Sequence, residues 1–299
     1  MNNSTEYILY LKDVSKIYND KIVLDDIDLA VSKGEFCTVV GPSGCGKSTL
    51  LRLILGQEQP SSGKILMTGK PVQLPSPDRG IVYQKYSLFP NLTILKNIML
   101  GKELSLPFMG RRRAKKRIRD EAMHYLGDVG LAEHAEKYPY QLSGGMQQRV
   151  AIAQTLIMKP KILMMDEPFG ALDPGTRENM QLMILKLWEE NKMTIFFVTH
   201  DLEEAVFLGT RILILSQFYL HESGDKREVQ NGARIVADYP LESFAPSSTR
   251  VKETAEFGKL IQNIRYEGFD PEYFQHAARF NLEHSDSFQT LKGEAASSR

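Results

Sequence analysis

The sequence lacks any run of about 18 consecutive apolar residues, the length that a helix needs to cross a bilayer. It also lacks a basic N-terminal stretch followed by a long apolar core, so Met1 to Leu11 do not read as a secretory signal. Formal net charge is zero, from 37 basic and 37 acidic residues, which gives no overall attraction to nucleic acid or anionic lipid. We expect a cytoplasmic protein that reaches a membrane only by docking on another subunit.

Cysteine is scarce, since the chain has only Cys37 and Cys45. Both lie close to one glycine-rich loop, where a structural disulfide is not expected, and such sparse use fits a reducing compartment. Cys45 lies inside the loop, where backbone amides and Lys47 could lower the pKa of its thiol. A small residue that simply fits the loop is an equally good interpretation, and the sequence leaves the two open.

What the chain does contain is a strong phosphate-binding motif, G-x-x-x-x-G-K-[ST]. A short buried-strand pattern at 35–40 precedes it, and a helical pattern at 48–56 follows it. Glycines let the backbone wrap around phosphate oxygens, and a helix N-terminus attracts negative charge. Lys47 is expected to reach the β- and γ-phosphates and Ser48 to ligate Mg²⁺. The motif consists of Gly41, Pro42, Ser43, Gly44, Cys45, Gly46, Lys47, Ser48 and Thr49.

A second helix start is also suited to anions. The segment 142–153 reads LSGGMQQRVAIA, in which Ser143 is a good N-cap and two glycines allow a close backbone approach. A chain with two such helix starts either folds both onto one ligand or donates one of them to another subunit.

Two carboxylates, Asp166 and Glu167, follow a buried-strand pattern at 161–165, and His200 follows another at 193–199. In open α/β sheets, ligands bind at the carboxyl ends of strands. One carboxylate can hold Mg²⁺ and the other can polarise an attacking water, while the histidine can touch a γ-phosphate. A helix-capping pair and a structural histidine are the alternatives, which the phosphate-binding motif makes less attractive.

Other patterns outline the fold. Paired strands are expected within 7–31, further strands at 60–69, 78–84, 211–215 and 233–237, and helices at 176–191 and 247–266. A helical region is expected at 88–138. Its basic run 111–117 could bind nucleic acid or lipid phosphate, but a solvated helix face is the favoured interpretation because no aromatic residues interleave it.

Together these residues resemble the ATP-binding subunit of ABC transporters, over about residues 7–237. The phosphate loop, the LSGGMQQR octet, the carboxylate pair and His200 occur in the family's order, and the octet is the most specific of them. The resemblance implies an α/β P-loop NTPase core with a mixed sheet, an N-terminal antiparallel β subdomain and an inserted α-helical subdomain at about 88–158. The ABC domain would cover 1–237, and 238–299 would form a helical appendage with a mobile tail.

The resemblance also implies roles for individual residues. Tyr18 would stack on adenine, Gln84 would sense Mg²⁺ and the attacking water, Asp166 would serve Mg²⁺, Glu167 would be the catalytic base and His200 the switch histidine. Residues that would contact nucleotide across a dimer are Ser143, Gly144, Gly145, Gln147 and Asp173. The segment 86–89 would meet a coupling helix of a permease.

In function, the chain resembles bacterial import ATPases, most of all the nitrate/sulfonate/taurine group. The resemblance implies a homodimer that binds ATP and Mg²⁺, lies peripherally on the cytoplasmic side of the cell membrane, and drives a permease supplied by a solute-binding protein, with no nucleic-acid partner. Alternatives are the ATPase of a lipid-trafficking or export system and a soluble, non-transport ABC ATPase. The transported solute, the role of 238–299 and any redox sensitivity of Cys45 stay open.

Overall fold

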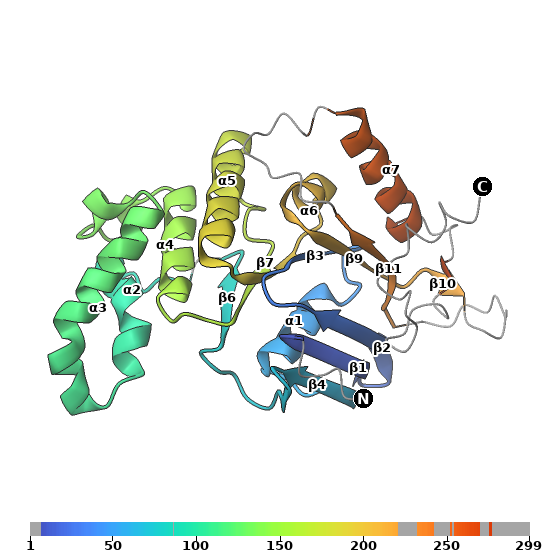
Figure 1. Cartoon of the computed structure of the whole chain (residues 1–299), viewed down its shortest axis with the longest axis horizontal. Coiled ribbons are helices and arrows are strands. Elements are labelled where there is room, and N and C mark those ends of the chain that lie inside the picture. Colours follow the sequence, from blue (N-terminus) through green and yellow to red (C-terminus); the bar gives the residue numbers. More distant parts are fainter. Residues whose placement is uncertain are drawn as a thin grey trace. The chain divides into compact units, whose positions relative to one another are not determined.

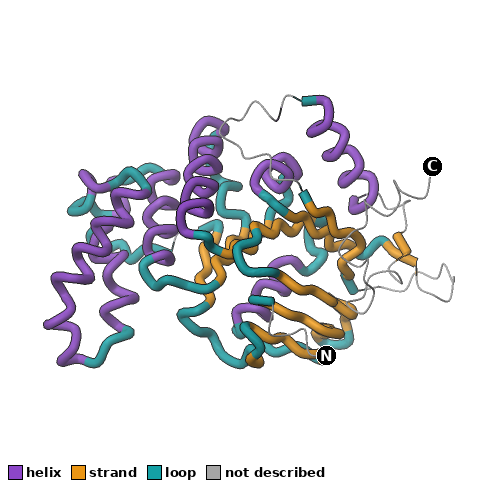
Figure 2. Tube along the Cα trace, viewed as in Figure 1, coloured by secondary structure: helices purple, strands orange, loops and turns teal. Residues whose placement is uncertain are grey.

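The computed structural model describes residues 7–85, 87–220, 232–241, 252, 254–269 and 275–276. The chain divides into two compact units: Met1–Ser76 with Thr194–Arg299, and Pro77–Met193. Figures 1 and 2 show the helices and strands of both. Within the described ranges, no helix combines the length and apolar character needed to cross a membrane.

The first unit contains an antiparallel sheet formed by β1 (Leu9–Tyr18), β2 (Lys21–Val31), β4 (Ser62–Met67) and β5 (Lys70–Pro71). The strand order is β2-β1-β4-β5. The β1–β2 hairpin turns at Asn19 and Asp20, whose φ angles of 44° and 67° are typical of the turn that matches strand twist. The N-terminal antiparallel subdomain expected from the sequence is therefore confirmed.

A mixed sheet completes the core of this unit. β3 (Phe36–Val40) lies between β8 (Thr194–Val198) and β9 (Arg211–Ser216), parallel to both, and β11 (Arg234–Pro240) runs antiparallel to β9. Every residue of β3, β8 and β9 is buried, as expected for strands covered on both faces. Two helices follow strands of this sheet, α1 (Lys47–Leu55) after β3 and α6 (Leu202–Leu208) after β8.

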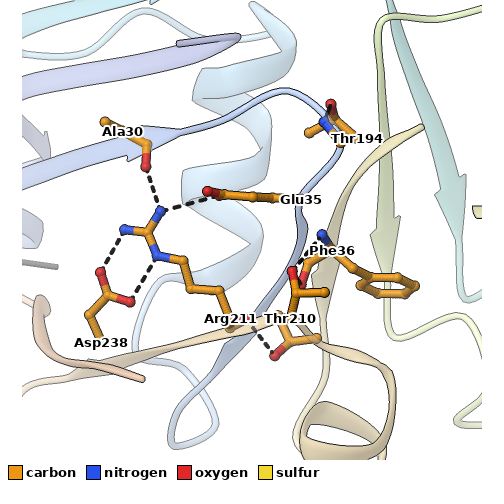
Figure 3. Close-up of polar contacts among 9 residues, drawn as sticks. Ala30, Glu35, Phe36, Thr194, Thr210, Arg211 and Asp238 are labelled. Atoms are coloured by element: carbon orange, nitrogen blue, oxygen red, sulfur yellow. Dashed lines mark hydrogen bonds and ion pairs between the residues drawn. The ribbon is translucent and has the colours of Figure 1, made fainter. Parts of the chain in front are cut away.

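A buried ion pair ties β9 to β11 (Figure 3). Arg211 donates to both Asp238 oxygens, at 2.8 and 2.6 Å, and to the Ala30 carbonyl at 2.6 Å, with Glu35 at 3.3 Å. Burial disfavours the charged guanidinium, but its pairing with Asp238 outweighs burial and raises the pKa of Arg211. Arg211 therefore links its own strand, β9, to β11, and also contacts the end of β2 and the loop that precedes β3.

After β11 the chain adds α7 (Ala255–Phe269), which packs against α6, β9 and β11 (Figure 1). A two-residue strand, β10 (Tyr219–Leu220), pairs in parallel with β12 (Gln275–His276). The helix expected at 247–266 is thus found from residue 255 onward. Residues 247–251 and the tail after 283 lie outside the described residues.

The second unit contains the parallel strands β6 (Arg79–Tyr83) and β7 (Ile162–Asp166). Its helices are α2 (Ile94–Leu104), α3 (Phe108–Asp128), α4 (Gly144–Leu156) and α5 (Pro174–Asn191), with short 3₁₀ turns at Ala132–His134 and Pro139–Gln141. α2 packs against α3 and α4. The basic run 111–117 lies on α3 and is mostly exposed, in agreement with a solvated helix face.

Buried Asn97 of α2 fixes the loop that follows β6. Its Oδ1 accepts from the Phe89 N–H at 2.7 Å, and its Nδ2 donates to the carbonyls of Phe89, Leu92 and Thr93, each at 3.1 Å. The Phe89 side chain is nevertheless 51% exposed. The loop therefore presents an aromatic ring on a fixed backbone. Tyr86, in the same segment, lies outside the described residues.

Candidate functional site

The phosphate-binding motif forms the loop between β3 and α1, as the sequence predicts. Gly44 and Gly46 have φ angles of 80° and 102°, which residues with a Cβ rarely adopt. A Cβ on Gly41 would lie 2.0 Å from the Leu215 carbonyl oxygen, so only glycine fits there. The loop then opens into α1, whose first residue is Lys47 and whose N-terminal N–H groups suit an anion.

The side chains of Lys47 and Cys45 are held inside this loop. Lys47 Nζ donates to the carbonyls of Gly41 and Pro42, at 2.8 and 3.0 Å. The Cys45 side chain is only 1% exposed. Burial raises the pKa of its thiol, with Lys47 opposing the shift more weakly. Of the two interpretations of Cys45 that the sequence allows, the structure favours the small residue that fits the loop.

His200 lies at the same sheet edge as this loop. Val39 of β3 is opposite Val198 of β8, and the Thr199 N–H donates to the Val39 carbonyl at 3.2 Å. Because the two strands are parallel, the residues that follow each of them meet at their carboxyl ends. The structure therefore brings His200, whose side chain is exposed, to the edge that carries the phosphate loop.

Tyr18 belongs to a polar cluster at the end of β1 that sequence reasoning missed. Its hydroxyl donates to Glu58 Oε2, and Lys16 Nζ lies 4.8 Å from the ring centroid. Glu58 also pairs with Lys16 at 3.2 Å and with Arg52 of α1 at 2.7 Å. The bond from Tyr18, reinforced by both cations, lowers the pKa of Glu58. Lys16 could have been found from strand alternation, since it lies two residues before Tyr18.

In the second unit, the predicted residues Gln84, Asp166 and Glu167 lie together at the carboxyl ends of β6 and β7. Tyr83 is opposite Asp166, so Gln84 and Glu167 are the next residues on neighbouring parallel strands. A Cβ on Gly170 would lie 3.0 Å from Gln84 Nε2 and 3.6 Å from the Glu167 carbonyl oxygen. Glu167 has φ 46°, an unfavourable region that persists where surrounding structure enforces it, often at functional sites.

The second helix start is built as the sequence predicts. Ser143 caps α4 by accepting from the Met146 N–H at 3.3 Å. A Cβ on Gly145 would lie 2.4 Å from Thr176 Cγ2 of α5, and Asp173 caps α5 by accepting from the Thr176 N–H at 3.0 Å. A hydrogen bond from the Thr176 hydroxyl, together with this bond from its backbone N–H, lowers the pKa of Asp173. The structure therefore brings the start of α4 close to the start of α5.

Two further glutamines hold this helix in place. Gln147 donates to the Leu142 carbonyl at 3.2 Å. Gln148 is fully buried and donates to the Tyr83 carbonyl at 3.4 Å, immediately before Gln84. Gln148 was not among the predicted site residues, because its link to β6 joins segments far apart in the sequence.

A phosphate loop between a buried strand and a helix, with polar residues at the carboxyl ends of neighbouring strands, defines a P-loop nucleotide-binding protein. A family profile described as ABC transporter matches residues 24–170. The chain is 38% identical over 257 residues to an aliphatic sulfonates import ATP-binding protein of Bacillus thuringiensis, which covers 84% of this chain and 97% of that protein. It is 45% identical over 195 residues to a nitrate import ATP-binding protein of Synechococcus elongatus, covering 65% and 70%.

Among solved structures, the chain resembles a dimeric ATP-binding cassette in a post-hydrolysis state bound to ADP and Pi. The TM-score is 0.60 at 32% identity, covering 79% of this chain and all of that one. The chain therefore belongs to the ABC transporter family and is one of its ATP-binding, ATP-hydrolysing proteins.

Proposed function

We propose that this ATPase powers import of a small solute through a membrane permease, from the cytoplasmic side of the cell membrane. The similarity that extends over 97% of an aliphatic sulfonates import protein carries the proposal. The 45% identity to a nitrate import protein points to the same group of importers. Nitrate, sulfonates, taurine and small amides are the solutes to test, delivered by a solute-binding protein.

Within the first unit, the phosphate loop binds the triphosphate and Tyr18 stacks on the base. The amides at the start of α1 and the charge of Lys47 favour phosphate oxygens. His200, at the same sheet edge, contacts the γ-phosphate. Support for these roles comes from the glycine-dependent loop backbone and from the pairing of β3 with β8.

Within the second unit, Glu167 acts as general base for the attacking water and Gln84 orients that water. Both follow directly on parallel strands, and the unusual backbone of Glu167 fits a functional position. The Asp166 carboxylate is an oxygen donor of the kind that Mg²⁺ prefers, and so, in the first unit, is the Ser48 hydroxyl. When bound, Mg²⁺ neutralises charge on the phosphates.

The working form is a homodimer in which each copy completes the site of the other. Ser143, Gly144 and Gly145 of one copy face the γ-phosphate bound by its partner, close to Asp173 at the start of α5. The capped, glycine-containing start of α4 supports this role, as does the dimeric arrangement of the similar cassette. Hydrolysis then opens the dimer.

The permease docks where Phe89 is exposed. The Phe89 ring is apolar and 51% exposed, and its backbone is fixed by Asn97. An exposed aromatic side chain on a fixed backbone is typical of a protein interface.

Purification from native membranes with a mild detergent tests the proposal. We expect a multi-spanning permease to copurify, and the complex to show ATPase activity that a binding protein stimulates when it carries nitrate or a sulfonate. A complex stimulated by lipid or by an export substrate would overturn the import assignment. A soluble nucleic-acid or ribosomal partner without a membrane subunit would overturn transport altogether.

A further inference from the structure

The Tyr18 side chain is restrained by groups from separate segments. Its hydroxyl is held by Glu58, which follows α1, and its ring lies under the ammonium group of Lys16. Lys16 is itself fixed, because it donates to the Gln59 carbonyl at 2.9 Å and pairs with Glu58 at 3.2 Å. Tyr18 stands at the tip of the β1–β2 hairpin, immediately before its turn, where a side chain without such partners would sample several rotamers.

Glu58 also links this ring to the phosphate loop. Arg52 Nε lies 2.7 Å from Glu58 Oε1, and Arg52 Nη2 donates to Thr49 Oγ1 at 3.1 Å. Thr49 is the last residue of the phosphate-binding motif. A continuous polar chain, Thr49–Arg52–Glu58–Tyr18, therefore connects the loop that holds phosphates with the ring assigned to the base.

We propose that Glu58 is a positioning residue for nucleotide binding: together with Lys16 it sets the Tyr18 ring at a fixed distance from the phosphate loop, so that the purine base finds a pre-ordered surface. This inference rests on the proposed role of Tyr18 in base stacking. Lys16 covers one face of the ring, and the base takes the opposite face, giving a stack of cation, tyrosine and purine.

The physical effect is pre-organisation of the site. If the Tyr18 side chain became ordered only when ATP binds, the loss of its rotamer freedom would weaken binding. A tyrosine that is already held in place does not carry this cost. The cluster is partly exposed, with side-chain exposures of 14% for Lys16, 26% for Glu58 and 42% for Arg52. Exposed ion pairs contribute little to folding stability. Loss of Glu58 should therefore lower the affinity for ATP more than it lowers folding stability.

The test measures nucleotide affinity on the full-length chain carrying Glu167→Gln, so that ATP is not turned over. A fluorescent ATP derivative labelled on the ribose is displaced by ATP or by inorganic tripolyphosphate, which has no base. Glu58→Ala should weaken ATP binding about 2- to 12-fold, the range expected for freeing one side chain, and leave tripolyphosphate binding within about twofold. Glu58→Gln, which keeps an acceptor oxygen, should fall between.

Two further variants separate the hydroxyl from the ring. In a Tyr18→Phe background, which keeps the ring, Glu58→Ala should cost less than about twofold, because the bond from the Tyr18 hydroxyl is already absent and Lys16 keeps its bond to the Gln59 carbonyl. Glu190→Ala serves as the matched control, since Glu190 is an exposed glutamate paired with Lys186 at 3.8 Å, and it should leave both affinities unchanged.

Each contrary result has a distinct meaning. Equal weakening of ATP and tripolyphosphate by Glu58→Ala would overturn the inference, because Glu58 would then act on the phosphate loop through Arg52. An unchanged ATP affinity in Glu58→Ala, with Tyr18→Ala strongly impaired, would also overturn it while leaving Tyr18 in its proposed role. An unchanged ATP affinity in Tyr18→Ala would remove the role of Tyr18 in base binding and this inference with it, without touching the ATPase or transport assignments.

Discussion

The residue that separates binding from turnover in the proposed site is Glu167. It follows β7 directly, and its backbone lies in the left-handed region at φ 46°. We expect Glu167→Gln to lower ATP turnover by about 10²–10⁴, because the amide cannot accept a proton from water, while ATP binding and ATP-driven dimers persist. Steady-state hydrolysis and size-exclusion chromatography with ATP measure the two properties. Glu178→Gln, at an exposed position of α5, is the control; normal hydrolysis by Glu167→Gln would remove it as the base.

Gly145 offers a second test at the residue scale, because its substitution has a defined steric consequence. A Cβ there would meet Thr176 Cγ2 at 2.4 Å. We expect Gly145→Ala to displace the start of α4 and reduce ATPase activity at least about tenfold, since a misplacement of about 1 Å in a catalytic site costs that much or more.

Thr176→Ser provides the matching rescue, since it removes the clashing methyl group but keeps the hydroxyl and the backbone N–H bonded to Asp173. Thr176→Ser alone should be close to wild type, and the double variant should recover most activity. Failure of the rescue would mean that Gly145 is needed for close approach of a ligand rather than for packing against α5.

How far the sequence predicts these residues depends on how local their partners are. The phosphate loop and the caps of α4 and α5 were predictable because each is built from neighbours in the chain. Glu58 and Gln148 were not, because Glu58 meets Tyr18 from 40 residues away and Gln148 meets Tyr83 from 65 residues away. Strand and helix periodicity carries no information on such pairs, which only the fold brings together.

Among the elements, α7 is the one whose packing the sequence left open. Two of its side chains are buried, Phe257 at 1% and Ile264 at 0% exposure, while Tyr266 is 55% exposed. Lys252, just before it, lies 4.4 Å from the Phe207 ring of α6. The helix is thus a packed part of its unit, joined to the element that follows His200.

Comparing the effects of two aromatic substitutions in α7 on stability tests this packing. We expect Phe257→Ala to destabilise the protein by about 3–5 kcal/mol, the usual cost of removing a buried phenylalanine. Tyr266→Ala should stay within about 0.5 kcal/mol, because that ring is largely exposed. Urea unfolding followed by circular dichroism measures both. Equal effects of the two substitutions would contradict the packing of α7 against α6, β9 and β11.

At the scale of the whole molecule, the fold class was predictable and the chain's last third was less so. Buried β-branched runs and the phosphate loop predict an α/β P-loop protein, and the antiparallel strands of 7–31 follow from alternation. The ion pair between β9 and β11 could not be predicted in this way, because Arg211 and Asp238 look like ordinary surface charges in the sequence. Their burial, at 8% and 0% exposure, follows from the pairing that the sheet imposes.

The proposed dimer makes a prediction that concerns two copies of the chain at once. Lys47→Ala disables the phosphate loop, and Ser143→Arg blocks the start of α4 that completes the partner's site. Each variant alone should be inactive. In an equal mixture, about half of the dimers are mixed, and one of the two sites in each mixed dimer is intact, so activity should return to about a quarter of wild type if the sites act independently.

The choice of control decides whether that recovery means head-to-tail assembly. Lys47 and His200 lie at the same sheet edge of the first unit and serve the same copy's site in the proposed arrangement, so a mixture of Lys47→Ala and His200→Ala leaves no site intact and should stay inactive. ATPase activity measured against mixing ratio checks both mixtures. Recovery in the control, or none in the first mixture, would contradict completion of each site by the partner's Ser143, because the pattern of recovery reports which residues share a site.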